Sequence, residues 1–238
     1  MKGYSLSRVA QYVRYHYVSH SKNYLSLLLV IVALPVLFGI LSRDMETVAG
    51  MSMAIYLFGG VAYALRTTYA MRYRGTKVMD AVVPISNEER FTSMLINLMV
   101  IYPVVMILCS TVAMLIVWPF SYTQDFVATF VRMVSDYYFD WAIYVLIQII
   151  CSASLLINLA ARRSLFIAYL GAFFGTIIFF TIMGNIGWEL FVYYDEELGE
   201  ALTNITIPEP LAVVLYCMIP VTFYAIAYLV LRRRQVKW

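Results

Sequence analysis

Two histidines are the first residues in this 238-residue chain whose type and spacing could do chemistry. His16 and His20 lie four residues apart, so on a helix both imidazoles could bind one metal ion. No acidic neighbour and no third ligand lies near them in the sequence. We therefore expect them to be interfacial aromatic side chains. The three cysteines fall in long apolar stretches and lack the spacing of a disulfide framework or a metal site. No catalytic, cofactor-binding or metal site is predicted.

A second group of chemically capable residues consists of amides within long apolar stretches, namely Asn97, Gln148 and Asn158. Two interpretations stay open for them. Hydrogen bonding between helices is the one we favour, because buried amides commonly serve this purpose in membranes. The other is a translocation path for a substrate. The six apolar intervals hold no ionisable Asp, Glu, Lys, Arg or His residue, which argues against a proton- or ion-coupled carrier and suits an apolar or amphipathic substrate.

The elements that position these residues must be membrane helices. The chain is 63% apolar and 13% charged, whereas soluble domains are about 45–50% apolar and about 25% charged. This composition excludes a soluble globular domain, and it excludes a disordered chain, which would be polar and rich in charge. Intervals without charge are each long enough to cross about 30 Å of hydrocarbon. We predict an all-α polytopic fold with six spans, at about 24–42, 47–65, 94–118, 141–161, 164–186 and 211–231.

The basic residues predict the orientation of these spans. With the N-terminus inside, 15 of the 17 Lys and Arg residues fall on one side with only 3 acids, while 11 of the 14 acids fall on the other side. Lys and Arg concentrate in cytoplasmic loops. We therefore expect a multi-pass protein of the inner (plasma) membrane with both termini in the cytoplasm.

Residues 1–23 show helical periodicity before the first span. Leu6, Val9, Ala10, Val13 and Tyr17 share one face of this segment, and the opposite face is polar and basic, with Arg8, Gln11, Tyr15, Ser19 and Lys22. A basic, aromatic, amphipathic helix lies in the membrane interface. The chain is thus divided into an interfacial helix over 1–23 and a six-helix domain over 24–238.

The loop between the second and third spans ends in a helix-start signal. Ser86 is followed three residues later by Glu89, the spacing of a capping box in which each side chain accepts from the other residue's backbone N–H. Pro84 disfavours helix at the residue before it. A new helix is therefore predicted from about Asn87, with Glu88 and Glu89 in its first turn. By itself the motif is an ordinary helix start.

The order of these parts resembles the ABC-2 type permeases, the membrane subunits of a class of ATP-binding-cassette transporters, in a short form common in the Bacteroidetes. Asn23-Tyr24-Leu25 is similar to the step into the first span in that form. The loop sequence from Val83 to Phe91 is similar to a Leu-Pro-x-Ser-x-x-Glu-x-Phe motif, with Val83 in place of leucine. Arg162 and Arg163 match a short basic turn between spans four and five. The layout matches over the whole chain, and only the loop motif is specific in its residues.

The resemblance implies an exporter subunit that is not itself an enzyme. In the family this loop forms a coupling helix that docks on an ATPase, which assigns coupling to Pro84, Ser86, Glu88, Glu89, Arg90 and Phe91, with a second contact at Arg162 and Arg163. The chain contains no Walker-A pattern, so ATP hydrolysis would belong to a partner subunit. The implied partners are that ABC ATPase, a second permease copy or a sister permease, and membrane lipids; no nucleic acid is expected.

Two other functions stay open. A stand-alone carrier or channel fits the same six spans. An intramembrane enzyme is a weaker alternative, because Glu88-Glu89 is similar to the paired glutamates of membrane CAAX-type proteases. Those proteases have arginine four residues after the second glutamate and histidines on later helices, whereas here position 93 is Ser93 and both histidines precede the spans.

Overall fold

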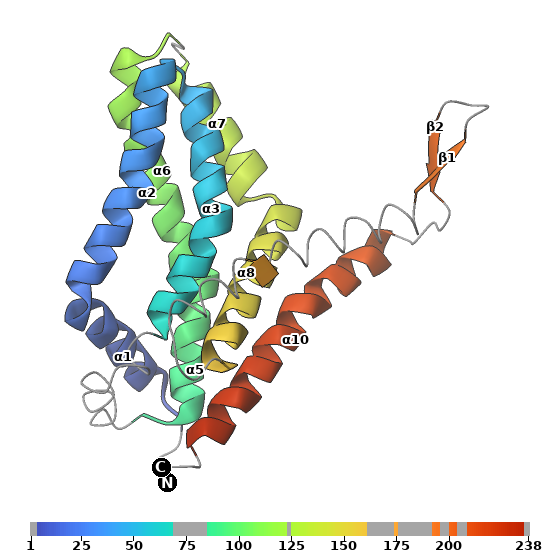
Figure 1. The fold of residues 1–238 in the computed structure, drawn as a ribbon. Helices are drawn as coiled ribbons and strands as arrows, with labels where there is room; N and C mark the ends of the chain where they lie inside the picture. The colour runs from blue at the N-terminus through green and yellow to red at the C-terminus, as the bar shows by residue number, and fades with distance from the viewer. Residues whose placement is uncertain are drawn as a thin grey trace.

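The chain folds mainly into long helices (Figure 1). The computed structural model describes residues 4–68, 85–122, 125–160, 174–175, 192–195, 200–203 and 209–235. The elements in order are α1 (Leu6–Ser19), α2 (Ser21–Ser42), α3 (Met45–Thr67), α5 (Asn87–Ile96), the π-helical turn η2 (Asn97–Ile101), α6 (Tyr102–Val117), the 3₁₀ turn η3 (Trp118–Phe120), α7 (Phe126–Met133), the π-helical turn η4 (Val134–Tyr138), α8 (Trp141–Ala160), β1 (Val192–Asp195), β2 (Glu200–Thr203) and α10 (Glu209–Gln235).

Four helical segments within the described residues are long and apolar enough to cross a membrane: Ser21–Ser42, Met45–Thr67, Asn87–Phe120 and Trp141–Ala160. They overlap the first four predicted spans, so a multi-pass membrane protein is confirmed. The predicted span 211–231 lies inside α10, a helix of 27 residues. The predicted span 164–186 lies outside the described residues, apart from 174–175. The count of six spans and the orientation stay predictions.

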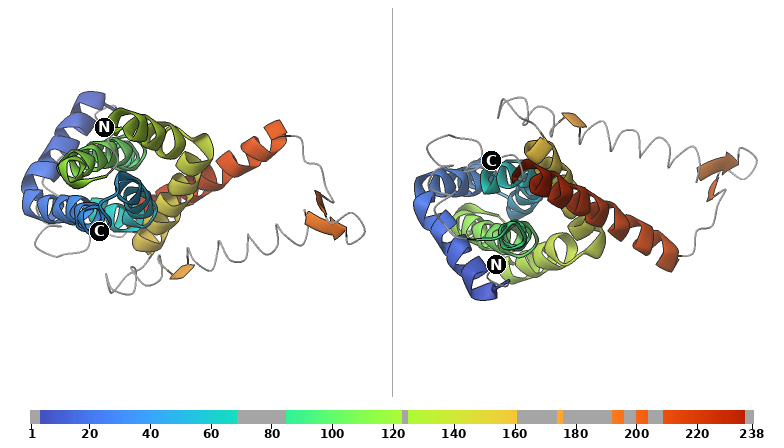
Figure 2. Two further views of the ribbon diagram at one scale, coloured as in Figure 1. Left: turned by 90° about the horizontal axis from the view of Figure 1, so that it is seen from above. Right: turned by 90° about the horizontal axis from the view of Figure 1, so that it is seen from below.

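Helix α3 lies at the centre of the bundle and packs against α2, α6 and α8. Helix α10 packs against α8 at one end and then diverges from the other helices (Figures 1 and 2). Leucines cover the outside of α2, where Leu25, Leu29, Leu37 and Leu41 are exposed, while tyrosines such as Tyr56 and Tyr63 are fully buried. An exterior of leucine around a core that includes polar groups suits lipid as the surrounding solvent.

A tight turn joins α2 to α3. Arg43 has a φ of 55°, the left-handed conformation that ends many helices, and it is the one such non-glycine residue in the described chain. Asp44 then caps α3 by accepting from the backbone N–H groups of Glu46 and Thr47, at 3.1 and 3.0 Å. The carbonyl of Arg43 also accepts from the backbone N–H of Tyr122 at 3.0 Å. This end of the bundle is therefore fixed to the end of the α5–α6 helix.

The α5–α6 helix runs from Asn87 to Phe120, 34 residues, with a π-helical turn inside it. Pro103 follows that turn and has no N–H to donate to the carbonyl of Met99, and its ring would crowd that carbonyl in a regular α-helix. The hydroxyl of Tyr144 on α8 donates to the Met99 carbonyl at 3.0 Å instead. The proline therefore accounts for the widened turn, and a neighbouring helix supplies the missing donor.

A short β-hairpin departs from the all-α expectation. β1 pairs antiparallel with β2, with Val192 opposite Thr203 and Asp195 opposite Glu200. The hairpin lies within the acidic loop that follows the predicted fifth span. The architecture is otherwise helical over the described residues.

Candidate functional site at the junction of α1 and α5

The first turn of α5 begins with the capping box that the sequence predicted. Ser86 Oγ accepts from the backbone N–H of Glu89 at 3.2 Å, and Glu89 Oε2 accepts from the backbone N–H of Ser86 at 2.9 Å. Helix α5 starts at Asn87, as expected. One carboxylate oxygen of Glu89 is thus committed to its own helix.

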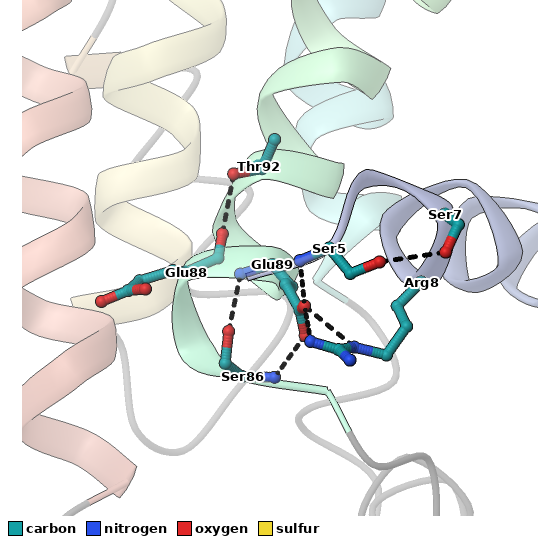
Figure 3. Close-up of polar contacts among 7 residues, drawn as sticks. All are labelled: Ser5, Ser7, Arg8, Ser86, Glu88, Glu89 and Thr92. Carbon is teal, nitrogen blue, oxygen red and sulfur yellow. Dashed lines mark hydrogen bonds and ion pairs between the residues drawn. The ribbon is translucent and has the colours of Figure 1, made fainter. Parts of the chain in front are cut away.

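The other carboxylate oxygen of Glu89 binds α1 (Figure 3). Oε1 accepts from the backbone N–H of Ser5 at 2.8 Å and from Nε and Nη2 of Arg8 at 2.9 and 2.5 Å. The Glu89 side chain is only 1% exposed and that of Arg8 is 26% exposed. A carboxylate so poorly exposed to water is tolerated only when it is paired and hydrogen-bonded, as it is here. We call Ser5, Arg8, Ser86 and Glu89 the α1–α5 latch.

The remaining residues of the predicted coupling motif point in different directions. Glu88 is exposed, and its side chain extends away from the latch (Figure 3). The guanidinium carbon of Arg90 lies 6.0 Å from the ring centre of Tyr12 on α1, at cation–π range. Phe91 is half-buried and packs on Tyr228 of α10, with ring centres 5.3 Å apart. The first turn of α5 therefore contacts helices on both sides of it.

Three of the predicted coupling residues, Pro84, Arg162 and Arg163, lie outside the described residues. The two acids of the motif do not form a paired site. Both Glu89 oxygens are occupied by the cap and by α1, and the side chains of Glu88 and Glu89 diverge (Figure 3). This arrangement gives no support to a catalytic acid dyad.

The buried residues of α1 overlap the predicted apolar face only in part. On that face Val9 is buried and Tyr17 is half-buried, but Leu6 is 68% exposed, and the two other buried residues of α1 are Tyr12 and His16. His16 Nε2 lies 2.9 Å from the hydroxyl of Tyr24. Periodicity did not indicate the burial of Tyr12 and His16, because in a membrane protein polar aromatic rings can enter the bundle while aliphatic side chains stay outside it.

His16, predicted to be an interfacial aromatic side chain, is only 4% exposed and lies among other aromatic rings. Its ring packs against those of Tyr12 and Tyr24, and the ring of His20 lies 4.9 Å away, centre to centre. Burial, with a further contribution from His20, lowers the pKa of His16 from 6.5 to about 4. The imidazole is therefore neutral near pH 7.

Two of the amides predicted for a translocation path make hydrogen bonds between helices. Asn97 Oδ1 accepts from the hydroxyl of Tyr17 on α1 at 2.7 Å. Gln148 on α8 accepts from the hydroxyl of Tyr224 on α10 at 2.8 Å, and its amide donates to the carbonyl of Leu98 at 3.4 Å. Asn158 is buried on α8 as well. Asn97 thus lies within the π-helical turn, and Gln148 contacts a backbone carbonyl of that turn.

A row of buried tyrosines, which no pattern in the sequence indicated, continues from these amides through the bundle. Tyr63 contacts Tyr17 and Tyr102, Tyr102 contacts Tyr56, and Tyr56 contacts Tyr138, with ring centres 4.8–5.5 Å apart between successive members from Tyr63 onward. The hydroxyl of Tyr102 donates to the carbonyl of Tyr56 at 2.7 Å. The high number of tyrosines, 20 in the chain, could have indicated such a row, but their spacing does not show which of them face inward.

No protein family model, curated protein or solved structure matches this chain.

Proposed function

We propose that this chain is the permease subunit of an ABC-2 type ATP-driven exporter, and that it docks a separate ATPase subunit through the loop that ends at Ser86. The observation that carries the proposal is the construction of the first turn of α5. Glu89 binds it to α1, Phe91 packs it against α10, and Glu88 is left exposed. Because contacts with α1 and α10 hold this turn in place, a partner protein that binds its exposed side can transmit force to the helix.

The mechanical consequence follows from helix length. Residues Asn87–Phe120 form one helix about 50 Å long at 1.5 Å per residue. A displacement at its first turn is passed along this helix toward the outer end, where Arg43 and Tyr122 join it to the α2–α3 turn. The π-helical turn at Asn97–Ile101 is the place where this helix bends most easily, because its backbone hydrogen bonds depart from the α-helical pattern.

The buried polar groups lie at this flexible point. Asn97 begins the π-helical turn, and Gln148 reaches the carbonyl of Leu98 within it. A change in the turn would alter the hydrogen bonds that join α1, α5, α8 and α10. In this proposal Asn97, Gln148 and Asn158 line the path of an apolar or amphipathic substrate, and ATP-driven bending of the helix opens that path.

The experiment is affinity purification of the tagged full-length chain from its own host in a mild detergent, with bound proteins identified by mass spectrometry. Glu88→Arg is the test variant because Glu88 is exposed and takes no part in the latch. Asp136→Arg is the matched control, an exposed acid in η4 far along the chain from α5.

We expect an ABC ATPase with the wild-type and Asp136→Arg proteins and at least fivefold less with Glu88→Arg, at equal membrane insertion. Charge reversal within an interface costs several kcal/mol, so a clear loss is required. Equal recovery with Glu88→Arg would refute docking at this turn. If no ATPase is bound to any of the three proteins, even after cross-linking, the stand-alone carrier or channel replaces the permease.

A further inference from the structure

One side of α1 forms an apolar groove with α5. The groove has a volume of about 420 Å³ and is lined by Leu6, Val9, Ala10, Val13, Arg14 and Ile96. Its one charged lining residue is Arg14, which is exposed and makes no ion pair within the described part of the chain. The groove thus combines an aliphatic floor with one unpaired positive charge.

The groove lies close to the start of a membrane span. Only His20 separates α1 from α2, which begins at Ser21. We therefore expect helix α1 at the level where lipid head groups meet acyl chains, the depth at which amphipathic helices bury their apolar faces. The latch holds α1 through Arg8 and Glu89, and the ion pair neutralises Arg8, so Arg14 is the charged residue that lines the groove.

Apolar surface is also found further along the α5–α6 helix. Ile96 is followed, across the π-helical turn, by Met99, Val100 and Pro103. The last three line a second apolar groove of about 400 Å³, together with Val104, Ile107, Tyr138, Phe139, Trp141 and Tyr144. An acyl chain that enters beside Arg14 therefore finds apolar surface further along the same helix.

We propose that the α1–α5 groove binds one anionic phospholipid, with an acyl chain over Ala10, Val13 and Ile96 and the head group on Arg14. Charge complementarity selects the lipid class, because basic residues between helices on the side predicted to be cytoplasmic attract anionic head groups. The long Arg14 side chain can follow the apolar surface while its guanidinium stays at the head-group level. This inference stands apart from the proposed function, because it involves no ATPase.

The test is native mass spectrometry of the full-length protein, delipidated in a neutral detergent and titrated with phosphatidylglycerol or with phosphatidylcholine of the same chain length. Arg14→Gln removes the charge, and Lys22→Gln is its control, an exposed base at the start of α2 outside the groove. Ala10→Phe fills the groove, and Val18→Phe is its control, a 69% exposed position on α1 outside the groove. Circular dichroism and gel filtration establish that each variant is folded.

We expect one tightly bound phosphatidylglycerol, with an affinity lowered about fivefold by Arg14→Gln, the effect of one basic residue at an anionic surface. Ala10→Phe should abolish this binding, and both controls should retain it. Equal affinity for phosphatidylcholine would overturn the proposal, as would an equal loss in Lys22→Gln, which would indicate diffuse attraction. Unchanged lipid binding in Ala10→Phe, or a change only in its oligomeric state, would also overturn it.

Discussion

Replacing Gly39 by alanine should destabilise the bundle, although alanine is the better helix former. A Cβ at Gly39 would lie 2.3 Å from Cγ2 of Val48 and 3.0–3.1 Å from the two γ carbons of Val117. Ordinary carbon contacts are about 3.5–4.0 Å, so α2 must move away from α3 and α6 by more than 1 Å. Val48 and Val117 are fully buried, which leaves neither side chain room to turn aside.

The expected magnitude follows from two opposing effects. Overpacking of this kind costs about 1–3 kcal/mol, and the exchange of glycine for alanine inside a helix returns about 1 kcal/mol. We expect a net loss of up to about 2 kcal/mol in the free energy of unfolding. Gly50→Ala is the matched control on α3, because a Cβ there has no atom within 4 Å. It should gain about 0.5–1 kcal/mol.

The assay is equilibrium unfolding in mixed detergent micelles, followed by circular dichroism at matched protein concentration. The sign of the difference between the two variants is the result that matters, because both make the same chemical change in a helix. If Gly39→Ala is as stable as Gly50→Ala, the conclusion that α2 approaches α3 and α6 closely at Gly39 is wrong.

Three other outcomes are expected. Between about pH 6.5 and pH 4, the free energy of unfolding should fall by up to about 3 kcal/mol, because the unfolded chain binds a proton at His16 in this range while the folded chain, in which the pKa of His16 is lowered to about 4, does not. His16→Gln should flatten this part of the thermal-stability profile. An unchanged slope in this variant would contradict the prediction. Tyr224→Phe removes the donor to buried Gln148 and should cost about 1 kcal/mol in the same unfolding assay, whereas exposed Tyr216→Phe should cost nothing measurable. Topology reporters within 72–77 and after Trp238 should report the cytoplasm, and one within 195–200 the outside; the reverse pattern would overturn the orientation.

The sequence determined the features that depend on short stretches of chain. The composition and the charge-free intervals placed the protein in a membrane, because the length of an apolar run sets whether a helix can span hydrocarbon. Three of the four spans within the described residues begin and end within three residues of their predicted positions, and the span Asn87–Phe120 begins seven residues before its predicted start at 94. The capping box of Ser86 and Glu89 was also readable, since its partners are three residues apart and every contact lies within one turn.

Only the tertiary structure decided what those local features contact. Arg8 and Glu89 are 81 residues apart, and no spacing rule relates them, so the second role of Glu89 was invisible in the sequence. The same holds for Phe91, whose partner Tyr228 comes from the far end of the chain. The sequence therefore identified the first turn of α5 as a candidate site but could not show that α1 and α10 brace it.

The inward face of each helix was the least predictable feature, and lipid is the physical reason. In water, burial separates apolar from polar residues, so periodicity indicates the core. In a bilayer the surroundings are as apolar as leucine, and packing and hydrogen bonding decide which side chains turn inward. Tyr12 and His16 accordingly face the bundle while Leu6 stays outside. Such a choice depends on partners such as Tyr24, which α2 supplies once the helices have assembled.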